Sequence, residues 1–296
     1  MVLFILFPGF GNSPKDWEYK FIEDKNKKHK LKKLDFLKKL KKIGKVYQYN
    51  PESYNISYYY TGRNLGYEDW QKIYQNLFKK PKKITLDNIN IDKECKRIYN
   101  LLKDKNEKFI PIGHSLGSWF ALHFSNLYPS KCLKTIFLDG SYIVPEIVDI
   151  YYKKRADKVK LNEITNENLE SLFSKMIENV KKDRYKHNKK INKYIDKIED
   201  ITGAYYYHTM KKELNGKIKV PLISFRNLNF DTETGKNKKK RNDVNMHRIK
   251  NEEGIYNKSG NKITTHYLIN SGHFPWTVQR YSDQIIDEIK KSLRKA

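Results

Sequence analysis

Short apolar runs alternate along the chain with stretches that have the spacing of amphipathic helices. Six runs are candidate strands, at residues 2–7, 45–49, 108–112, 134–138, 219–225 and 263–269. The first, third and fourth are dense in Ile, Leu, Val and Phe, which is typical of strands buried on both faces. The pattern therefore predicts a sheet with layers on both sides.

Helical spacing occupies the segments between these strands. In residues 31–43 a Leu or Ile recurs every three positions, and Gly44 follows as a C-terminal stop. Further helices are predicted at 91–104, 116–127 and 278–293. Strand followed by helix, repeated, predicts an α/β fold: a mostly parallel sheet of about six strands, with right-handed crossovers and helices on both faces.

Residues 140–218 break this alternation. They contain no convincing strand, and helical patterns lie near 143–156, 166–182, 188–200 and 204–214. The segment is far longer than a crossover between neighbouring strands needs. We therefore predict that residues 141–218 form an inserted helical cap, and that residues 1–140 and 219–296 form the core domain. Residues 232–261 are a second insertion and are interpreted as a long loop.

A G-x-S-x-G motif follows the strand at 108–112 and opens the next helix; it spans residues 113–117. Such a turn is so tight that Ser115 adopts a strained backbone conformation with an exposed hydroxyl. Side chains at Gly113 and Gly117 would collide with the neighbouring strand or helix. The positive end of the helix faces the serine. His114 lies inside this turn and is expected to point into the fold. Ser115 is the candidate nucleophile.

A serine needs a general base, and the base needs an acid that fixes its tautomer. His273 follows the last strand, so we expect it at the carboxyl end of the sheet together with Ser115, where ligands of open α/β sheets bind. Asp231 and Asp139 both follow strands and both keep the order Ser, Asp, His. Asp231 is the preferred acid. Asp139 is the alternative, and it ranks second because Gly140 directly after it also suits a plain turn.

An oxyanion hole requires two backbone donors. The N–H of Leu116, directly after the nucleophile, is one candidate. The second is the N–H of Phe10, in the loop after the first strand, where Gly9 and Gly11 allow close approach of the backbone.

The PGFG loop, the GHSLGS turn and the SGHFPW segment together resemble the α/β-hydrolase superfamily, over roughly residues 1–140 and 219–296. The resemblance implies that the sheet starts at what is usually the third strand. It also implies a triad of Ser115, His273 and Asp231 with an oxyanion hole at Phe10 and Leu116. Two departures are visible: Pro8 stands where many members have His, and the segment before Asp231 lacks the glycine of the usual acid turn.

The net charge of +26 would suit a protein that binds polyanions, but its composition favours another interpretation. About 51 of the 60 basic residues are Lys and about 9 are Arg, although Arg is the residue suited to bidentate phosphate contacts. Asn is also frequent, which indicates a compositional bias. We expect weak attraction to anionic surfaces and no specific nucleic-acid partner. The tyrosine clusters 58–60 and 205–207 are expected to pack internally instead of stacking on bases.

Other features of the sequence limit the functional classes to which the protein can belong. The chain has no nucleotide-binding or metal-binding motif, so we predict no cofactor and no metal. Two cysteines and no long apolar run favour a soluble, cytoplasmic protein without a transmembrane segment. The sequence thus predicts a serine hydrolase that cleaves a carboxylic ester or thioester, of the esterase, lipase or thioesterase kind. The alternatives are a peptidase similar to proline iminopeptidases and a non-enzymatic polyanion-binding protein on the same scaffold.

Overall fold

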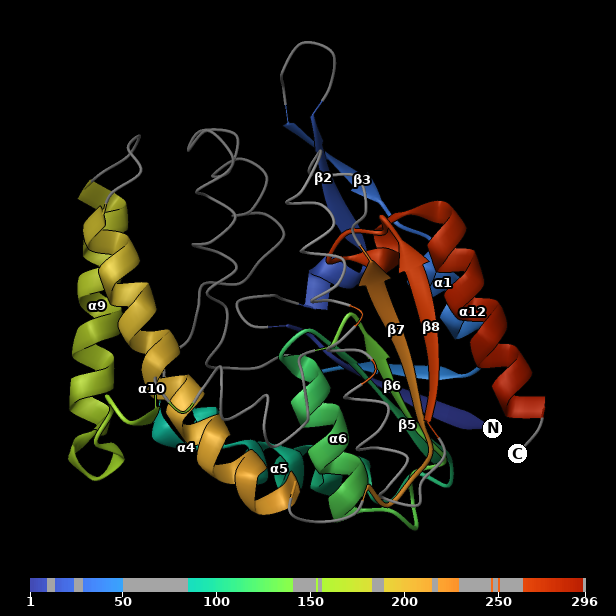
Figure 1. Ribbon diagram of the computed structural model, residues 1–296, viewed down its shortest axis with the longest axis horizontal. Helices are drawn as coiled ribbons and strands as arrows, with labels where there is room; N and C mark the ends of the chain where they lie inside the picture. The colour runs from blue at the N-terminus through green and yellow to red at the C-terminus, as the bar shows by residue number, and fades with distance from the viewer. Residues whose placement is uncertain are drawn as a thin grey trace.

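The computed structural model describes residues 1–9, 14–23, 29–49, 85–140, 153, 156–182, 189–214, 218–228, 246, 250 and 263–294. Within these residues, six strands form one sheet in the order β4-β1-β5-β6-β7-β8, and all neighbours are parallel (Figure 1). The strands are β1 (Val2–Phe7), β4 (Lys45–Gln48), β5 (Lys108–His114), β6 (Thr135–Leu138), β7 (Leu222–Leu228) and β8 (Ile263–Ile269). The predicted mostly parallel sheet is confirmed.

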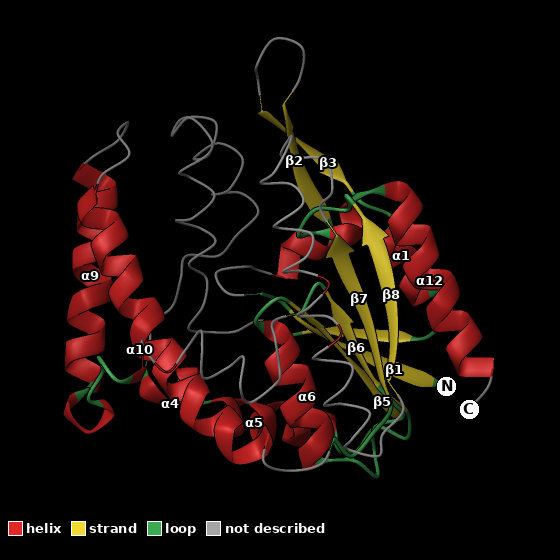
Figure 2. Ribbon diagram, viewed as in Figure 1, coloured by secondary structure: helices red, strands yellow, loops and turns green. Residues whose placement is uncertain are grey.

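Helices cover both faces of this sheet (Figure 2). One face carries α1 (Phe36–Lys41) and α12 (Gln279–Arg294), and the other carries α5 (Ile91–Leu102) and α6 (Gly117–Leu127). The period-two pattern of β1 explains the division, since successive side chains of a strand point to opposite faces. Phe4 and Leu6 pack in the α1/α12 core, whereas Ile5 packs in the α5/α6 core. A short helix, α4 (Leu86–Ile89), precedes α5.

The sheet has a switch point beside its central strand. The chain runs from β1 to β4 on one side, and then crosses to β5 on the other side of β1. In open α/β sheets, the crevice at the carboxyl ends of the strands on either side of such a point is where ligands bind. The loops that begin at Pro8 and at Ser115 leave β1 and β5 at this place.

The described part of the region predicted as a cap contains a 3-10 turn, η4 (Leu161–Glu163), followed by two helices, α9 (Asn166–Lys182) and α10 (Lys189–Leu214). The predicted break between residues 200 and 204 is wrong, because α10 runs through Gly203. A mid-helix glycine costs only about 1 kcal/mol, and Ile201 and Ala204 beside it are buried in the same core as α5 and α6.

Helix α10 packs against α5 and α6 (Figure 1). Tyr206 and Tyr207 are 1% and 4% exposed, and the ring of Tyr206 meets that of Phe120 edge-on at 5.6 Å. The expectation that this tyrosine cluster packs internally is confirmed for these two residues. Residues 58–60, 141–152 and 232–245 lie outside the described residues, so the domain boundaries stay a prediction.

The predicted helix at 31–43 begins too early. Its first residues belong to an antiparallel ribbon formed by β2 (Tyr19–Glu23) and β3 (His29–Lys33), and helix α1 starts only at Phe36. Leu31 pairs with Phe21 in the ribbon, and the N–H of Leu34 donates to the carbonyl of Glu18 at 2.7 Å. Leu31 and Leu34 therefore fit a helical spacing by position alone, while Leu31 pairs with β2 and Leu34 bonds to the residue just before β2. A 3-10 turn, η1 (Pro14–Trp17), precedes the ribbon.

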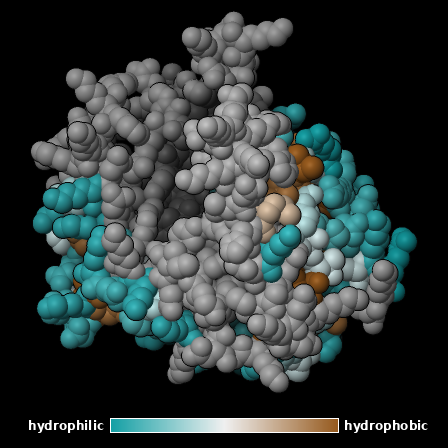
Figure 3. All heavy atoms as spheres, viewed as in Figure 1, coloured by the Kyte–Doolittle hydropathy of each residue, from teal (hydrophilic) through white to brown (hydrophobic). Residues whose placement is uncertain are grey.

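The surface over α12 is hydrophilic. On the right of Figure 3, where this helix runs in Figure 1, the described atoms are mostly teal, and the outward face of the helix carries exposed residues that include Gln284, Asp287 and Lys290. Among the helices that the structure describes, none has the length and apolar character to cross a membrane.

Candidate active site

The G-x-S-x-G turn has the strained geometry that the sequence predicts. Ser115 directly follows β5 with φ of 49°, a conformation that is rare for a residue with a side chain. A Cβ on Gly113 would lie 2.4 Å from the carbonyl oxygen of Gly117, and a Cβ on Gly117 would lie 2.3 Å from the carbonyl oxygen of Phe7. Glycine is therefore required at both positions, and the turn presents Ser115 at the carboxyl end of the sheet.

His273 reaches the same end from a loop after β8. This loop includes Asn270 with φ of 55° and Gly272 with φ of 70°, and it ends in η5 (Pro275–Thr277). Nδ1 of His273 lies 2.7 Å from Oδ2 of Asp139. Because a carboxylate only accepts, Nδ1 carries the proton, and Nε2 of a neutral ring is then available as a base. The His273 side chain is 51% exposed.

The carboxylate beside His273 is the alternative acid of the sequence analysis. Asp139 follows β6 with φ of 46°, and its own N–H donates to the carbonyl of Phe225 at 2.7 Å. Its Oδ1 accepts the backbone N–H of Asn227 at 3.2 Å, which leaves Oδ2 for His273. Asp231, the preferred acid, lies outside the described residues, so its role stays a prediction. The described contact joins His273 to Asp139, and Ser115 and Asp139 follow the neighbouring strands β5 and β6.

The end of β7 connects the acid turn to the histidine loop, a role that sequence reasoning missed. Asn227 Oδ1 accepts a hydrogen bond from the hydroxyl of Ser271 at 3.1 Å, two residues before His273. The guanidinium of Arg226 is buried and donates to the carbonyl of Gly140, next to Asp139. The sequence signal was the unusual placement of two polar residues at the end of an otherwise apolar strand.

The candidate oxyanion donors are partly located. A Cβ built on Gly9 would lie 3.1 Å from Cβ of Ser115, so the loop after β1 begins directly beside Ser115. Leu116 occupies the N-cap position of α6, where backbone N–H groups of the first turn lack helical partners. Phe10 lies outside the described residues, and its role stays a prediction.

Aromatic side chains enclose His114, which is 1% exposed. Its ring lies 4.6 Å from that of Trp276, 4.8 Å from that of Phe274 and 4.6 Å from that of His273. Burial, with a smaller contribution from the charge of His273, lowers the pKa of His114 well below its ordinary value. His114 is therefore a neutral imidazole at pH 7.

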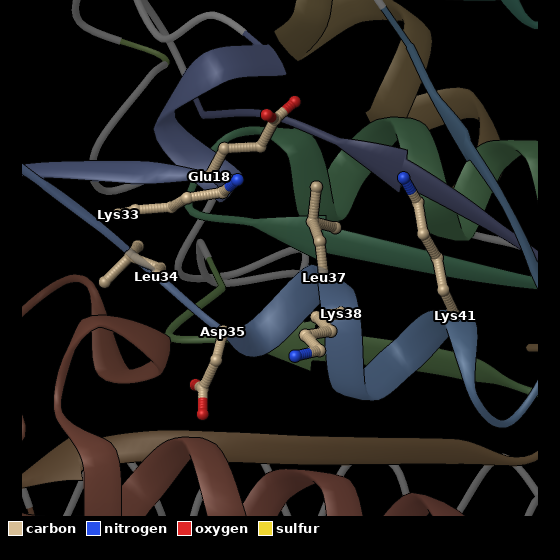
Figure 4. A pocket seen from close by; sticks show the side chains of 7 residues that line it. All are labelled: Glu18, Lys33, Leu34, Asp35, Leu37, Lys38 and Lys41. Carbon is tan, nitrogen blue, oxygen red and sulfur yellow. The ribbon is translucent and has the colours of Figure 1, made fainter.

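A separate groove of about 570 Å³ lies beside the ribbon and does not include Ser115, Asp139 or His273 (Figure 4). Its lining comes from the residue after η1, from the end of β3 and from α1, and consists of Glu18, Lys33, Leu34, Asp35, Leu37, Lys38 and Lys41. Among the described residues, no three His, Cys, Asp or Glu side chains are placed to share a metal ion.

No family model and no curated protein matches this sequence. Solved structures do resemble it. NosK from Streptomyces actuosus superimposes with a TM-score of 0.52 at 9% identity, over 100% of this chain and 98% of that one. A thermophilic esterase from Thermogutta terrifontis, with malate bound, gives a TM-score of 0.50 at 14% identity, over 100% and 90% of the two chains. At these identities the likeness shows a shared fold, and the chain has the fold of these two proteins.

Proposed function

We propose that this protein is a serine hydrolase that cleaves carboxylic esters or thioesters. The observation that carries the proposal is the 2.7 Å contact between His273 Nδ1 and Asp139 Oδ2, at the end of the sheet where the strained Ser115 is presented. We assign the acid to Asp139 in place of Asp231 on this contact.

The reaction follows from these roles. Nε2 of His273 removes the hydroxyl proton of Ser115 as the oxygen attacks the acyl carbonyl, and later gives that proton to the leaving alcohol or thiol. Asp139 holds the reactive tautomer and stabilises the imidazolium. A water molecule, deprotonated by His273, then releases the acid from the acyl-enzyme and regenerates the free serine.

The electrostatics of the site support this chemistry. Backbone N–H groups of Leu116 and of the loop after β1, at Phe10, hold the negative charge on the tetrahedral oxygen. The N-terminal end of α6 adds a partial positive charge at the same place. His114, the nearest other imidazole among the described residues, is kept neutral by burial, so it does not oppose the cation that forms on His273.

The substrate is proposed to have an apolar acyl or leaving group. The support is the aromatic ring of Phe274, which is 37% exposed immediately after the base and lies 5.4 Å from the His273 ring. An exposed ring beside the reacting atoms favours an apolar substrate group through burial of its surface.

A fluorophosphonate probe tests the proposal directly, because it reacts covalently with an activated serine. Wild-type protein should be labelled at Ser115, as mapped by peptide mass spectrometry, and Ser115→Ala should not be labelled. A series of p-nitrophenyl esters and acyl thioesters of increasing chain length then defines the substrate. Equal labelling of both proteins would remove the support for this function.

A further inference from the structure

His114 lies next to the nucleophile in the chain but has no step in the proposed reaction. Its Nε2 lies 2.8 Å from the backbone carbonyl oxygen of His273. A carbonyl oxygen only accepts, so Nε2 must carry the proton, and the neutral ring then has its lone pair on Nδ1. This hydrogen bond therefore links the turn that holds the proposed nucleophile to the loop that holds the proposed base.

The opposite edge of the ring faces the loop after β1. A Cβ built on Gly9 would lie 2.9 Å from Nδ1 of His114. Thus the His114 ring separates the loop that carries the proposed oxyanion donor from the loop that carries His273. It is held there by Trp276, which meets it edge-on at 4.6 Å, and by Trp17, whose ring centre is 6.4 Å away.

Few described hydrogen bonds hold the loop that contains His273 in place. Gly272, His273 and Phe274 are exposed, and a Cβ built on Gly272 would meet open space. The described hydrogen bonds that fix residues 271–273 from outside the loop run to Asn227, Asp139 and His114. Of these, His114 is the partner of the His273 backbone.

We propose that His114 is a positioning residue, whose Nε2–H fixes the backbone of His273 so that the catalytic ring stays aligned with Ser115. The inference rests on the proposed hydrolase function. Misplacing a catalytic group by about 1 Å costs roughly 10²-fold in rate. Loss of this hydrogen bond should therefore lower kcat while substrate binding changes little.

Two substitutions separate the hydrogen bond from the volume of the ring. His114→Phe keeps an aromatic ring in the cluster but removes the donor, whereas His114→Gln keeps a side-chain N–H donor. With a p-nitrophenyl ester, His114→Phe should lower kcat by about 10- to 100-fold, with KM changed less than about threefold. His114→Gln should retain most of the wild-type kcat. The rate of fluorophosphonate labelling of Ser115 should follow kcat.

His123→Phe is the matched control. His123 is also 1% exposed and lies on α6, but its ring faces Asp92 on α5, away from His273. This control should lower the thermal midpoint and leave kcat and labelling within about twofold of wild type. A wild-type kcat in His114→Phe, or equal losses in the Phe and Gln variants, would overturn the proposal.

A measurement that needs no activity keeps the inference distinct from the proposed function. The ¹³Cδ2 and ¹⁵N chemical shifts of His114 in the wild-type protein report its tautomer, and the Nε2–H form is expected at pH 7. The Nδ1–H form or a charged ring would overturn the inference even if turnover is normal. If the Nε2–H form is observed but neither labelling nor turnover is found, the hydrolase function is rejected. The catalytic role of the His114 hydrogen bond is then rejected with it.

Discussion

Nδ1 of His273 lies 2.7 Å from Oδ2 of Asp139, although 134 positions separate the two residues in the chain. The contact arises because both residues follow strands of one parallel sheet, whose carboxyl ends meet at one edge. His114 and Leu138 are partners in the register of β5 and β6, so the residues after them, Ser115 and Asp139, leave adjacent strands. Ser115 and Asp139 are thereby placed side by side at the carboxyl end of the sheet.

Replacing Asp139 by Asn should lower kcat by about 10³- to 10⁴-fold, because an amide can stabilise the wrong tautomer of His273 and cannot balance the charge of the imidazolium. The fold should be retained, since the Asn side-chain oxygen still accepts the N–H of Asn227. Steady-state kinetics with an activated ester, together with circular dichroism, check both expectations.

Asp231→Asn is the control for that experiment. Its kcat should stay within about fivefold of wild type if Asp139 is the acid. A greater loss in Asp231→Asn than in Asp139→Asn would return the acid role to Asp231, the residue preferred from the sequence.

Alanine at two glycines should have unequal effects on stability. In Gly113→Ala the new Cβ would meet backbone atoms of Gly117 and Ser118 at 2.4 Å, which requires a backbone shift and should cost about 3 kcal/mol or more. Gly272→Ala meets open space, so it should cost only the roughly 1–2 kcal/mol of a positive φ. Urea unfolding measures both, and the reverse order would contradict the described turn geometry.

Acidification should destabilise the protein through His114. Burial lowers its pKa well below the ordinary 6.5, so below pH 6.5 the unfolded chain binds a proton that the native state does not. The free energy of unfolding therefore carries no penalty from His114 above about pH 6.5. Below that pH it decreases by up to about 1.4 kcal/mol per pH unit for this one group. Burial lowers the pKa of His266 in the same direction.

The free energy of urea unfolding, measured between pH 5 and pH 8, checks this dependence. In His114→Gln, position 114 no longer titrates, so the decline below pH 6.5 should be shallower than in wild type. Parallel curves for the two proteins would show that His114 does not bind a proton differently in the folded and unfolded states.

The pattern of apolar residues was sufficient to predict the sheet, because strands buried on both faces leave a dense and distinctive signal. β1 and β8 begin and end where the alternation predicts, and the tight turn at Ser115 follows from two glycines whose positions admit no side chain. Helix α9 also has the predicted bounds. These features depend on local spacing, which a sequence displays directly.

Features that depend on contacts between distant segments were not predictable in the same way. The ribbon of β2 and β3 is held by hydrogen bonds between two segments, and the sequence of either segment alone does not display them. The leucine spacing of residues 31–43 therefore indicated a helix that starts five residues too early. Both candidate acids follow strands and keep the same chain order. The support for Asp139 comes from its contact with His273 and from its left-handed backbone, neither of which has a sequence pattern.

The central claim is that Ser115 is an activated nucleophile. The most direct measurement is the rate of covalent labelling by a fluorophosphonate in wild type, Ser115→Ala and His273→Ala, with the modified peptide identified by mass spectrometry. We predict labelling of wild type at Ser115 alone, none in Ser115→Ala, and a rate at least about 10³-fold lower in His273→Ala, because the serine then lacks its base. Labelling of wild type at a residue other than Ser115, or an unchanged rate in His273→Ala, would contradict the account.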